Sequence, residues 1–359
     1  MYHTNRVNHT KKVILPLKDH ILRTWPGINF LFSIIQNKEN AYDWIMNSYV
    51  QIYGVLNDNI DRVGRIDYYP YCMHNFPFSI YDLCPFIVKY ALPTDIIIDQ
   101  YHTFTNFLMD ALDKGLYVSS LLDQFFRPER EGEQGVFHAS YIYGYDMEKQ
   151  LIYAADHFYH QKYSFMKIDF DKMNEAYRLL DNPPRLNGFR TYLYALKDAA
   201  FKFDLKLLVD LFKDYLHAKN PFGSFNRFTK ITKNQLNEYY GLNCYDMLQT
   251  YLHRIIDIYH GKGKDCRFFV SLVDHKTLMK LRIDYLIRKG YLSNAASLVN
   301  EIKALEVGCK ITLSLFLKYM ITDDISLVDK ISKKLENFKS RDQRMTEVLI
   351  EKLEQGKSF

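Results

Sequence analysis

The sequence predicts an α+β fold followed by an all-α helical region. Two observations support this prediction. A segment with the apolar spacing of a helix is followed directly by several strand-like segments, and after residue 192 nearly every segment has helical periodicity. A run of consecutive strands next to helices is typical of an antiparallel sheet packed on helices.

The front half begins with helical patterns. Apolar residues in the segment 25–54 recur at intervals that fit helix faces better than strand alternation. Residues 79–92 are expected to form a short helix that Pro93 stops, and the β-branched residues 96–98 a short strand. Residues 104–114 are amphipathic and are followed by a glycine, which predicts a helix with a C-terminal glycine.

A group of strands is expected next. The polar segment 127–134 links the first two, and the turn Asp146–Lys149 makes a tight hairpin between the second and the third. The expected strands are residues 116–122, 139–145, 151–155 and 163–168.

The back half is expected to be a helical bundle with short connections. We therefore predict two domains, residues 1–182 and residues 190–359, joined by a linker that contains Pro183-Pro184. The expected helices of the second domain are residues 205–218, 236–259, 275–289, 293–305, 311–320, 325–338 and 342–354.

Five scattered cysteines predict reduced thiols. They are odd in number and include no Cys-x-x-Cys pair, which argues against a disulfide framework and a zinc site. The polar N-terminal residues contain no signal-peptide pattern, and the longest apolar runs are too short to span a bilayer. We expect a cytoplasmic protein without membrane association. The cysteines are Cys72, Cys84, Cys244, Cys266 and Cys309.

The net charge of +5 is unevenly distributed, with a balance of −4 over residues 1–180 and +9 over residues 181–359. A basic region can serve nucleic acid, a membrane surface or an acidic protein. No nucleic-acid-binding module accompanies the charge, and the lysines are spread over the expected helices. A solvated helical surface and an acidic protein partner are both compatible with this pattern.

One constellation indicates chemistry. His138 begins one expected strand, and Asp156 ends its hairpin partner, so that the two side chains come together across the sheet. The carboxylate can then accept a hydrogen bond from one imidazole nitrogen and fix the tautomer, as the third member of a nucleophilic triad does. Alternatively, His138 is a hydrogen-bonded structural residue.

The segment from His138 through Gly144-Tyr145-Asp146, with Asp156 eighteen positions after the histidine, resembles papain-fold enzymes of bacterial secondary metabolism. It is most similar to the butirosin biosynthesis protein H family, and more loosely to peptidases that cut bacteriocin leaders. The resemblance covers about residues 20–180 and implies a papain-like N-terminal domain with a separate second domain. It also implies that His138 is the base and Asp156 the residue that orients it.

The nucleophile departs from the family pattern. The family places a cysteine at the start of the first core helix, where this chain has Gly27-Ile28-Asn29-Phe30. The nearest cysteine before the histidine is Cys72, in an aromatic segment after a proline, and we predict it as the nucleophile. Cys84 is expected to be a small core residue. A metal site made of His74, His157 and His160 with Asp156 is a further alternative, but no metal or organic cofactor is expected.

The resemblance implies an acyltransferase, or amide synthase, of natural-product biosynthesis. Such an enzyme moves an acyl group from a carrier-protein thioester to a small-molecule amine. The missing cysteine near Asn29 favours a second hypothesis, a non-catalytic papain-like protein that binds a peptide, a carrier domain or a metabolite. A cysteine hydrolase or peptidase is the third.

Overall fold

The structure is a computed structural model. It describes residues 10–18, 22, 24–57, 63–69, 79–130, 133–159, 162–179, 189–220, 237–258 and 260–356. Within these ranges, no helix is both long enough and apolar enough to cross a membrane. The fold is mixed α and β, with antiparallel sheets and with long helices at the C-terminal end of the chain.

The chain forms two compact units, and each contains two separate stretches of sequence. Unit 1 consists of Met1–Ala41 and Ile80–Ala200, and unit 2 of Tyr42–Ser79 and Phe201–Phe359. Unit 1 contains β1 (Lys12–Ile14), α1 (Pro26–Ile35), β4 (Ile87–Pro93), α3 (Thr94–Gln100), α4 (Phe104–Asp113), β5 (Tyr117–Asp123), the 3-10 helix η2 (Pro128–Arg130), β6 (Phe137–Asp146), β7 (Leu151–Tyr159), β8 (Lys162–Asp169), α5 (Phe170–Arg178) and β9 (Phe189–Leu196).

The remaining elements belong to unit 2, except that α2 begins on the last residue of the first stretch of unit 1. They are α2 (Ala41–Asn47), β2 (Ile52–Leu56), β3 (Gly64–Tyr68), α6 (Leu205–Leu216), β10 (Asn237–Tyr240), the 3-10 helix η3 (Gly241–Asn243), α8 (Cys244–His253), the π-helix η4 (Arg254–Ile258), α9 (Arg267–Arg288), α10 (Ala296–Thr322) and α11 (Ser326–Gln355).

Unit 1 contains a seven-stranded antiparallel sheet in the order β4-β9-β5-β6-β7-β8, with β1 also paired to β6. The hairpin between β6 and β7 lies where the sequence predicts it. The amide of Lys149 donates to the carboxylate of Asp146 at 3.1 Å, and Gln150 takes the left-handed conformation that ends the turn. The strands expected in this region are therefore confirmed as β5 to β8.

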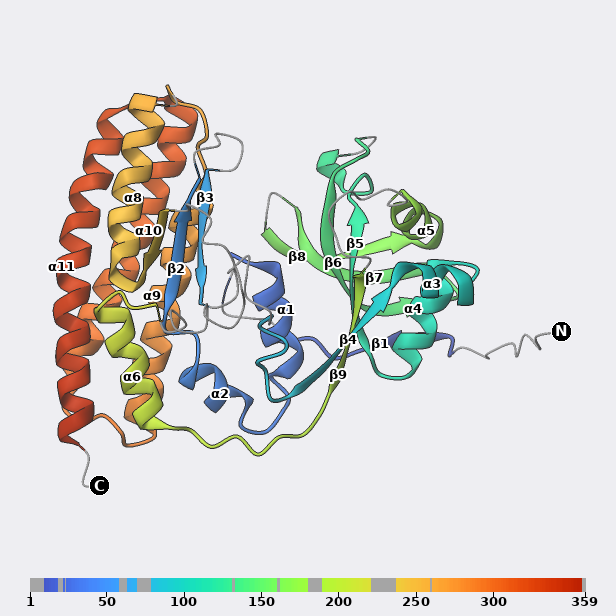
Figure 1. Cartoon of the computed structure of the whole chain (residues 1–359), viewed down its shortest axis with the longest axis horizontal. Helices are drawn as coiled ribbons and strands as arrows, with labels where there is room; N and C mark the ends of the chain where they lie inside the picture. The colour runs from blue at the N-terminus through green and yellow to red at the C-terminus, as the bar shows by residue number, and fades with distance from the viewer. Residues whose placement is uncertain are drawn as a thin grey trace. The chain divides into compact units, whose positions relative to one another are not determined.

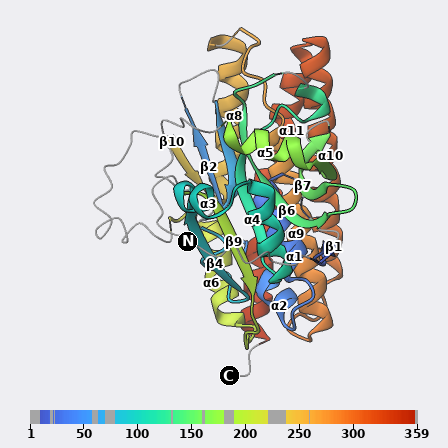
Figure 2. The ribbon, with the colours of Figure 1, turned by 90° about the vertical axis from the view of Figure 1, so that its right-hand side faces the viewer.

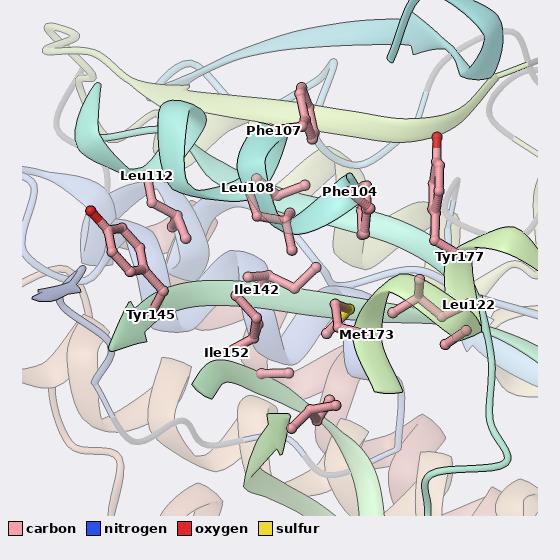
Figure 3. Close-up of a cluster of buried hydrophobic side chains, with 14 of the residues drawn as sticks. Phe104, Phe107, Leu108, Leu112, Leu122, Ile142, Tyr145, Ile152, Met173 and Tyr177 are labelled. Carbon is pink, nitrogen blue, oxygen red and sulfur yellow. The ribbon is translucent and has the colours of Figure 1, made fainter. Parts of the chain in front are cut away.

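Helices cover both faces of this sheet (Figure 1). On one face, α4 and α5 bury a core with β5, β6 and β7, and Figure 3 shows Leu108, Ile142 and Met173 within it. The α4 helix begins at Thr103, whose side chain accepts from the amide of Asn106 at 3.2 Å. On the other face, the ring of Phe30 in α1 packs 4.7 Å from that of Tyr141 in β6.

Two local predictions in unit 1 are wrong. The segment expected to be a helix up to residue 92 contains β4, because residues 87–93 pair with β9, about a hundred residues later in the chain. The expected strand at residues 96–98 lies in helix α3, where only Ile97 is buried and its two neighbours are about half exposed. β-Branched residues favour a strand, but this segment forms a helix that packs on β4 and β9.

Unit 2 combines a three-stranded antiparallel sheet, in the order β10-β2-β3, with helices. Strand β2 contacts α8, and β3 contacts α9. Figures 1 and 2 show α10 and α11 running alongside one another. Unit 2 is therefore not the all-helical domain that the sequence predicts.

Buried polar side chains of α9 bind the backbone near the start of the stretch Tyr42–Ser79 of unit 2. The Arg282 guanidinium is fully buried and donates to the carbonyl oxygens of Met46 at 2.7 Å and Ser48 at 2.5 Å. The His275 imidazole lies 2.9 Å from the carbonyl oxygen of Val50. These bonds satisfy backbone carbonyl groups at the end of α2 and just after it, and they hold the early segment against the late helix.

The division into units differs from the expected domains 1–182 and 190–359. The expected linker at Pro183-Pro184 lies outside the described residues. After it, β9 returns to the sheet of unit 1 between β4 and β5, so that unit 1 extends to Ala200. Long-range strand pairing, in unit 1 through β9 and in unit 2 through β2, decides this division.

Candidate functional site

The candidate site lies on β6 and β7. The pairs Tyr141–Ala155 and Ile142–Ala154 set the register, and its continuation puts Asp156 opposite Ser140, two residues from His138 on the same face of the sheet. The Nδ1 atom of His138 lies 3.0 Å from Oδ2 of Asp156. The predicted contact between the two side chains is confirmed.

The hydrogen bonds of the imidazole identify its tautomer. Nδ1 lies within hydrogen-bond distance of two acceptors, the Asp156 carboxylate and the Ala139 carbonyl oxygen at 2.9 Å. An atom between two acceptors carries the proton, so Nδ1 is the donor. In the part of the chain that the structure describes, Nε2 of His138 has no partner, and 47% of the side chain is exposed. Nε2 can therefore accept a proton from a reacting group.

The Asp156 carboxylate is fully buried. Its Oδ2 accepts from His138 and its Oδ1 from the amide of His157 at 2.7 Å. A buried carboxylate favours a positive charge on its partner, because few other groups compensate its own charge. The pair thus combines a buried anion with a half-exposed imidazole.

The pKa of His138 lies above its ordinary value. Burial lowers this pKa, but the hydrogen bond and the negative charge of Asp156, with the Ala139 carbonyl, raise it by more. The nearby Arg127 guanidinium opposes the rise through charge repulsion. Near neutral pH, the imidazolium form is consequently more populated than for a free histidine, a form that favours a neighbouring thiolate.

Strand alternation assigns the dyad to one face of the sheet. His138 pairs with Leu122, a core residue on the α4–α5 face. The α1 helix contacts the opposite face through Phe30 and Tyr141. Helix α1, which contains the segment Gly27 to Phe30, therefore packs on the side of this sheet opposite the dyad.

Asn29 lies in α1, in the segment where the resemblance led us to look for a cysteine. The residue is fully buried, and neither polar atom of its side-chain amide has a hydrogen-bond partner among the described residues. Its backbone carbonyl accepts from the hydroxyl of Ser33 at 2.8 Å. An amide cannot replace a thiol in acyl transfer, so Asn29 is not a nucleophile.

The described cysteines have thiols that are hard to ionise. In unit 1, Cys84 is buried, and burial raises the pKa of its thiol to about 12. In unit 2, burial likewise raises the pKa values of the Cys244 and Cys266 thiols, and it raises the pKa of Cys309 to about 12. Cys72 lies outside the described residues, and its role as nucleophile stays a prediction.

Two of the three histidines of the alternative metal site, His74 and His160, also lie outside the described residues. His157 is described, and its ring stands edge-on to Tyr163 at 6.1 Å. Across the described ranges, no group of three or more His, Cys, Asp or Glu side chains is placed to hold a metal ion.

The sequence did not point to the residues between β5 and β6 that surround the start of the histidine strand. The Asp123 carboxylate accepts from the amides of Phe125 at 3.0 Å and Gly135 at 2.7 Å, and so closes the connecting loop. The next residue, Gln124, is fully buried and contacts the backbone of His138. The sequence feature that could have indicated these residues is the adjacent polar pair Asp123-Gln124 directly after the expected strand 116–122.

The chain matches no protein-family model, and no curated protein matches it.

Proposed function

We propose that the protein is a cysteine-dependent acyltransferase that uses the His138–Asp156 dyad. The observation that carries the proposal is the 3.0 Å contact between Nδ1 of His138 and the buried carboxylate of Asp156, in a half-exposed imidazole whose Nε2 has no partner among the described residues. This arrangement suits a base whose tautomer and orientation are held by a carboxylate. The proposal also draws on the resemblance of about residues 20–180 to the butirosin biosynthesis protein H family and on the fold and activity of that family.

The nucleophile in this proposal is Cys72. The four other thiols have raised pKa values, and a thiol that stays protonated at neutral pH attacks slowly. Cys72 is the remaining cysteine, and the proposal assigns the thiolate to it.

The proposed reaction has two steps. The Cys72 thiolate attacks the carbonyl carbon of a carrier-bound thioester, a new thioester forms on the enzyme, and the carrier thiol leaves with the proton from His138. An amine then attacks the acyl-enzyme and forms an amide, while Nε2 of His138 takes its proton and the cysteine leaves as thiolate. The basic charge of residues 181–359 favours an acidic carrier protein as donor.

The second candidate is a non-catalytic binding protein on the same scaffold. It is favoured by α1, which carries Asn29 and no cysteine, and by the position of the dyad on the sheet face opposite α1. In that case, His138 would contact a bound peptide, carrier domain or metabolite as a hydrogen-bond donor, and no covalent intermediate would form.

Thiol reactivity separates the two candidates. The native protein is treated with iodoacetamide at neutral pH, and the alkylation rate of each cysteine is measured by peptide mass spectrometry. We expect Cys72 to react at least about tenfold faster than Cys266, the most exposed of the described thiols, because a neighbouring imidazolium stabilises its thiolate. The His138→Gln variant should remove this difference.

A second measurement follows the acyl-enzyme itself. Intact-mass spectrometry of the protein with a small acyl thioester should show one added acyl group, absent in the Cys72→Ala variant. If Cys72 alkylates no faster than Cys266 and no acyl-enzyme forms, the acyltransferase proposal fails and the binding protein remains.

A further inference from the structure

Gln124 joins the end of β5 to the start of β6. Its side-chain Nε2 donates to the carbonyl oxygens of Leu122 and His138, each at 3.1 Å, and lies 3.4 Å from Oγ of Ser140. Its backbone amide donates to the carbonyl oxygen of Val136 at 2.8 Å. The buried side-chain amide of Gln124 therefore connects the end of β5 to the start of β6.

The backbone at this point decides where the imidazole lies. Nδ1 of His138 bonds both to Asp156 on the next strand and to the carbonyl of Ala139, its own neighbour. The regular pairing of β5 with β6 ends at Asp123 and Phe137, one residue before His138. His138, which pairs with Leu122, therefore lies near the end of this ladder, and the side chain of Gln124 gives its carbonyl oxygen a further donor.

Stability alone does not explain a glutamine here. The residue is fully buried, and its Oε1 has no hydrogen-bond partner among the described residues. A buried acceptor without a donor is unfavourable, and an apolar side chain of the same length would avoid this cost. The hydrogen bonds that the Gln124 side chain donates therefore have a role other than filling the core.

We propose that Gln124 is a positioning residue that holds His138 in the orientation in which its imidazole meets Asp156. The inference rests on the proposed function only in assigning His138 the role of base. Because the amide nitrogen of Gln124 is engaged by protein acceptors, the residue acts through His138 and not on a substrate. The charged groups that face the imidazole are Asp156 from β7 and Arg127 from the segment before η2.

The test is the titration of His138 in the full-length Gln124→Met variant. Methionine keeps the length of the side chain and removes both polar atoms. The histidine Cε1–H signals are followed by NMR against pH, and the His138→Gln variant identifies the signal among the 12 histidines. We expect the His138 pKa to fall from its raised value toward the ordinary value of about 6.5, because the ring loses its fixed contact with Asp156.

A matched control is Gln249→Met in unit 2, where the Nε2 of Gln249 donates to the Ser332 carbonyl at 2.7 Å. This variant makes the same chemical change and should leave the His138 titration unchanged. If Gln124→Met does not fold, as judged by circular dichroism, Gln124→Asn replaces it. Asparagine keeps the amide but is one methylene too short to bridge the two strands, so the same fall is expected.

An unchanged His138 titration in a folded Gln124 variant would overturn the inference, as would loss of folding in both variants, which would make Gln124 a residue of the core. The titration requires neither a nucleophile nor a substrate. A shifted His138 together with an unreactive Cys72 would thus support the positioning role and reject the acyltransferase. Acyl transfer together with an unchanged His138 pKa would support the acyltransferase and reject the positioning role of Gln124.

Discussion

Replacement of Lys276 by methionine should destabilise unit 2 strongly. Lys276 in α9 is fully buried and forms an ion pair with the fully buried Asp342 of α11. The same carboxylate oxygen accepts from the hydroxyls of Tyr215 in α6 at 2.6 Å and Tyr245 in α8 at 3.1 Å. Four helices therefore meet at one buried charge pair.

The magnitude follows from what the substitution leaves behind. Removing one partner of a buried ion pair costs about 3–5 kcal/mol, because the remaining charge is buried without compensation. Asp342 retains two tyrosine hydroxyl donors in the Lys276→Met variant, so we expect a loss near the lower limit, about 3 kcal/mol. Methionine fills most of the volume of the lysine stem, which limits any added cavity cost.

The assay is equilibrium unfolding in urea, followed by helical circular dichroism, since most of the long helices belong to unit 2. The matched control is Lys289→Met at the end of the same helix. Lys289 is half exposed and 3.4 Å from Asp43, and an ion pair of this kind contributes about 0–1 kcal/mol. In the double variant Lys276→Met/Asp342→Asn, the loss should be smaller than the sum of the single losses by at least about 1 kcal/mol.

The reasoning is refuted if Lys276→Met costs no more than Lys289→Met. Additive losses in the double variant would also contradict it, because they would mean that the two buried charges do not depend on each other.

Two further predictions concern the dyad and a tight turn. The folded-state pKa of His138 is raised, so the dyad stabilises the protein fully below the unfolded pKa of about 6.5, and the contribution is lost as pH rises through the folded-state value. The stability difference between wild type and Asp156→Asn, measured by urea unfolding, should therefore be larger at about pH 6 than at about pH 8. Equal differences at the two pH values would contradict this prediction. Gly241→Ala should cost clearly more than Gly290→Ala, for which we expect only the left-handed backbone strain of about 1–2 kcal/mol. Both glycines have positive φ, but only at Gly241 would the added methyl lie 2.1 Å from the Tyr215 carbonyl oxygen. Similar urea-unfolding midpoints for the two variants would contradict this prediction, because they would show that the backbone near Gly241 moves to accommodate the methyl group.

Several long helices differ from the sequence predictions because tertiary contacts bridge apparent breaks. The expected helices 293–305 and 311–320 are joined in the single helix α10, which begins only at Ala296, and 325–338 and 342–354 are joined in α11, which begins at Ser326. Gly308 looks like a helix breaker, but a Cβ there would lie 2.5 Å from the ring of Phe338 in α11. The glycine permits close packing of the two helices, and that packing stabilises the continuous helix.

Local chemistry made part of the site predictable. Strand alternation, the hairpin turn at Asp146–Gln150 and the spacing of His138 and Asp156 all act over a few residues or across one hairpin. The sequence therefore determined that a histidine and an aspartate meet on adjacent strands. It also determined the amphipathic helix α4 with its Thr103 cap, because the signals for a helix and its cap are local.

Only the tertiary structure decided the rest, because the contacts involved join residues far apart in the chain. Pairing with β9 turned residues 87–93 into a strand, and buried groups of α9 drew the segment 42–79 into unit 2. The face of the sheet on which the dyad lies, opposite α1, follows from the packing of helices on both sides. The role we propose for Gln124 depends equally on such a contact, since its amide reaches a carbonyl fourteen residues away that no sequence pattern could associate with it.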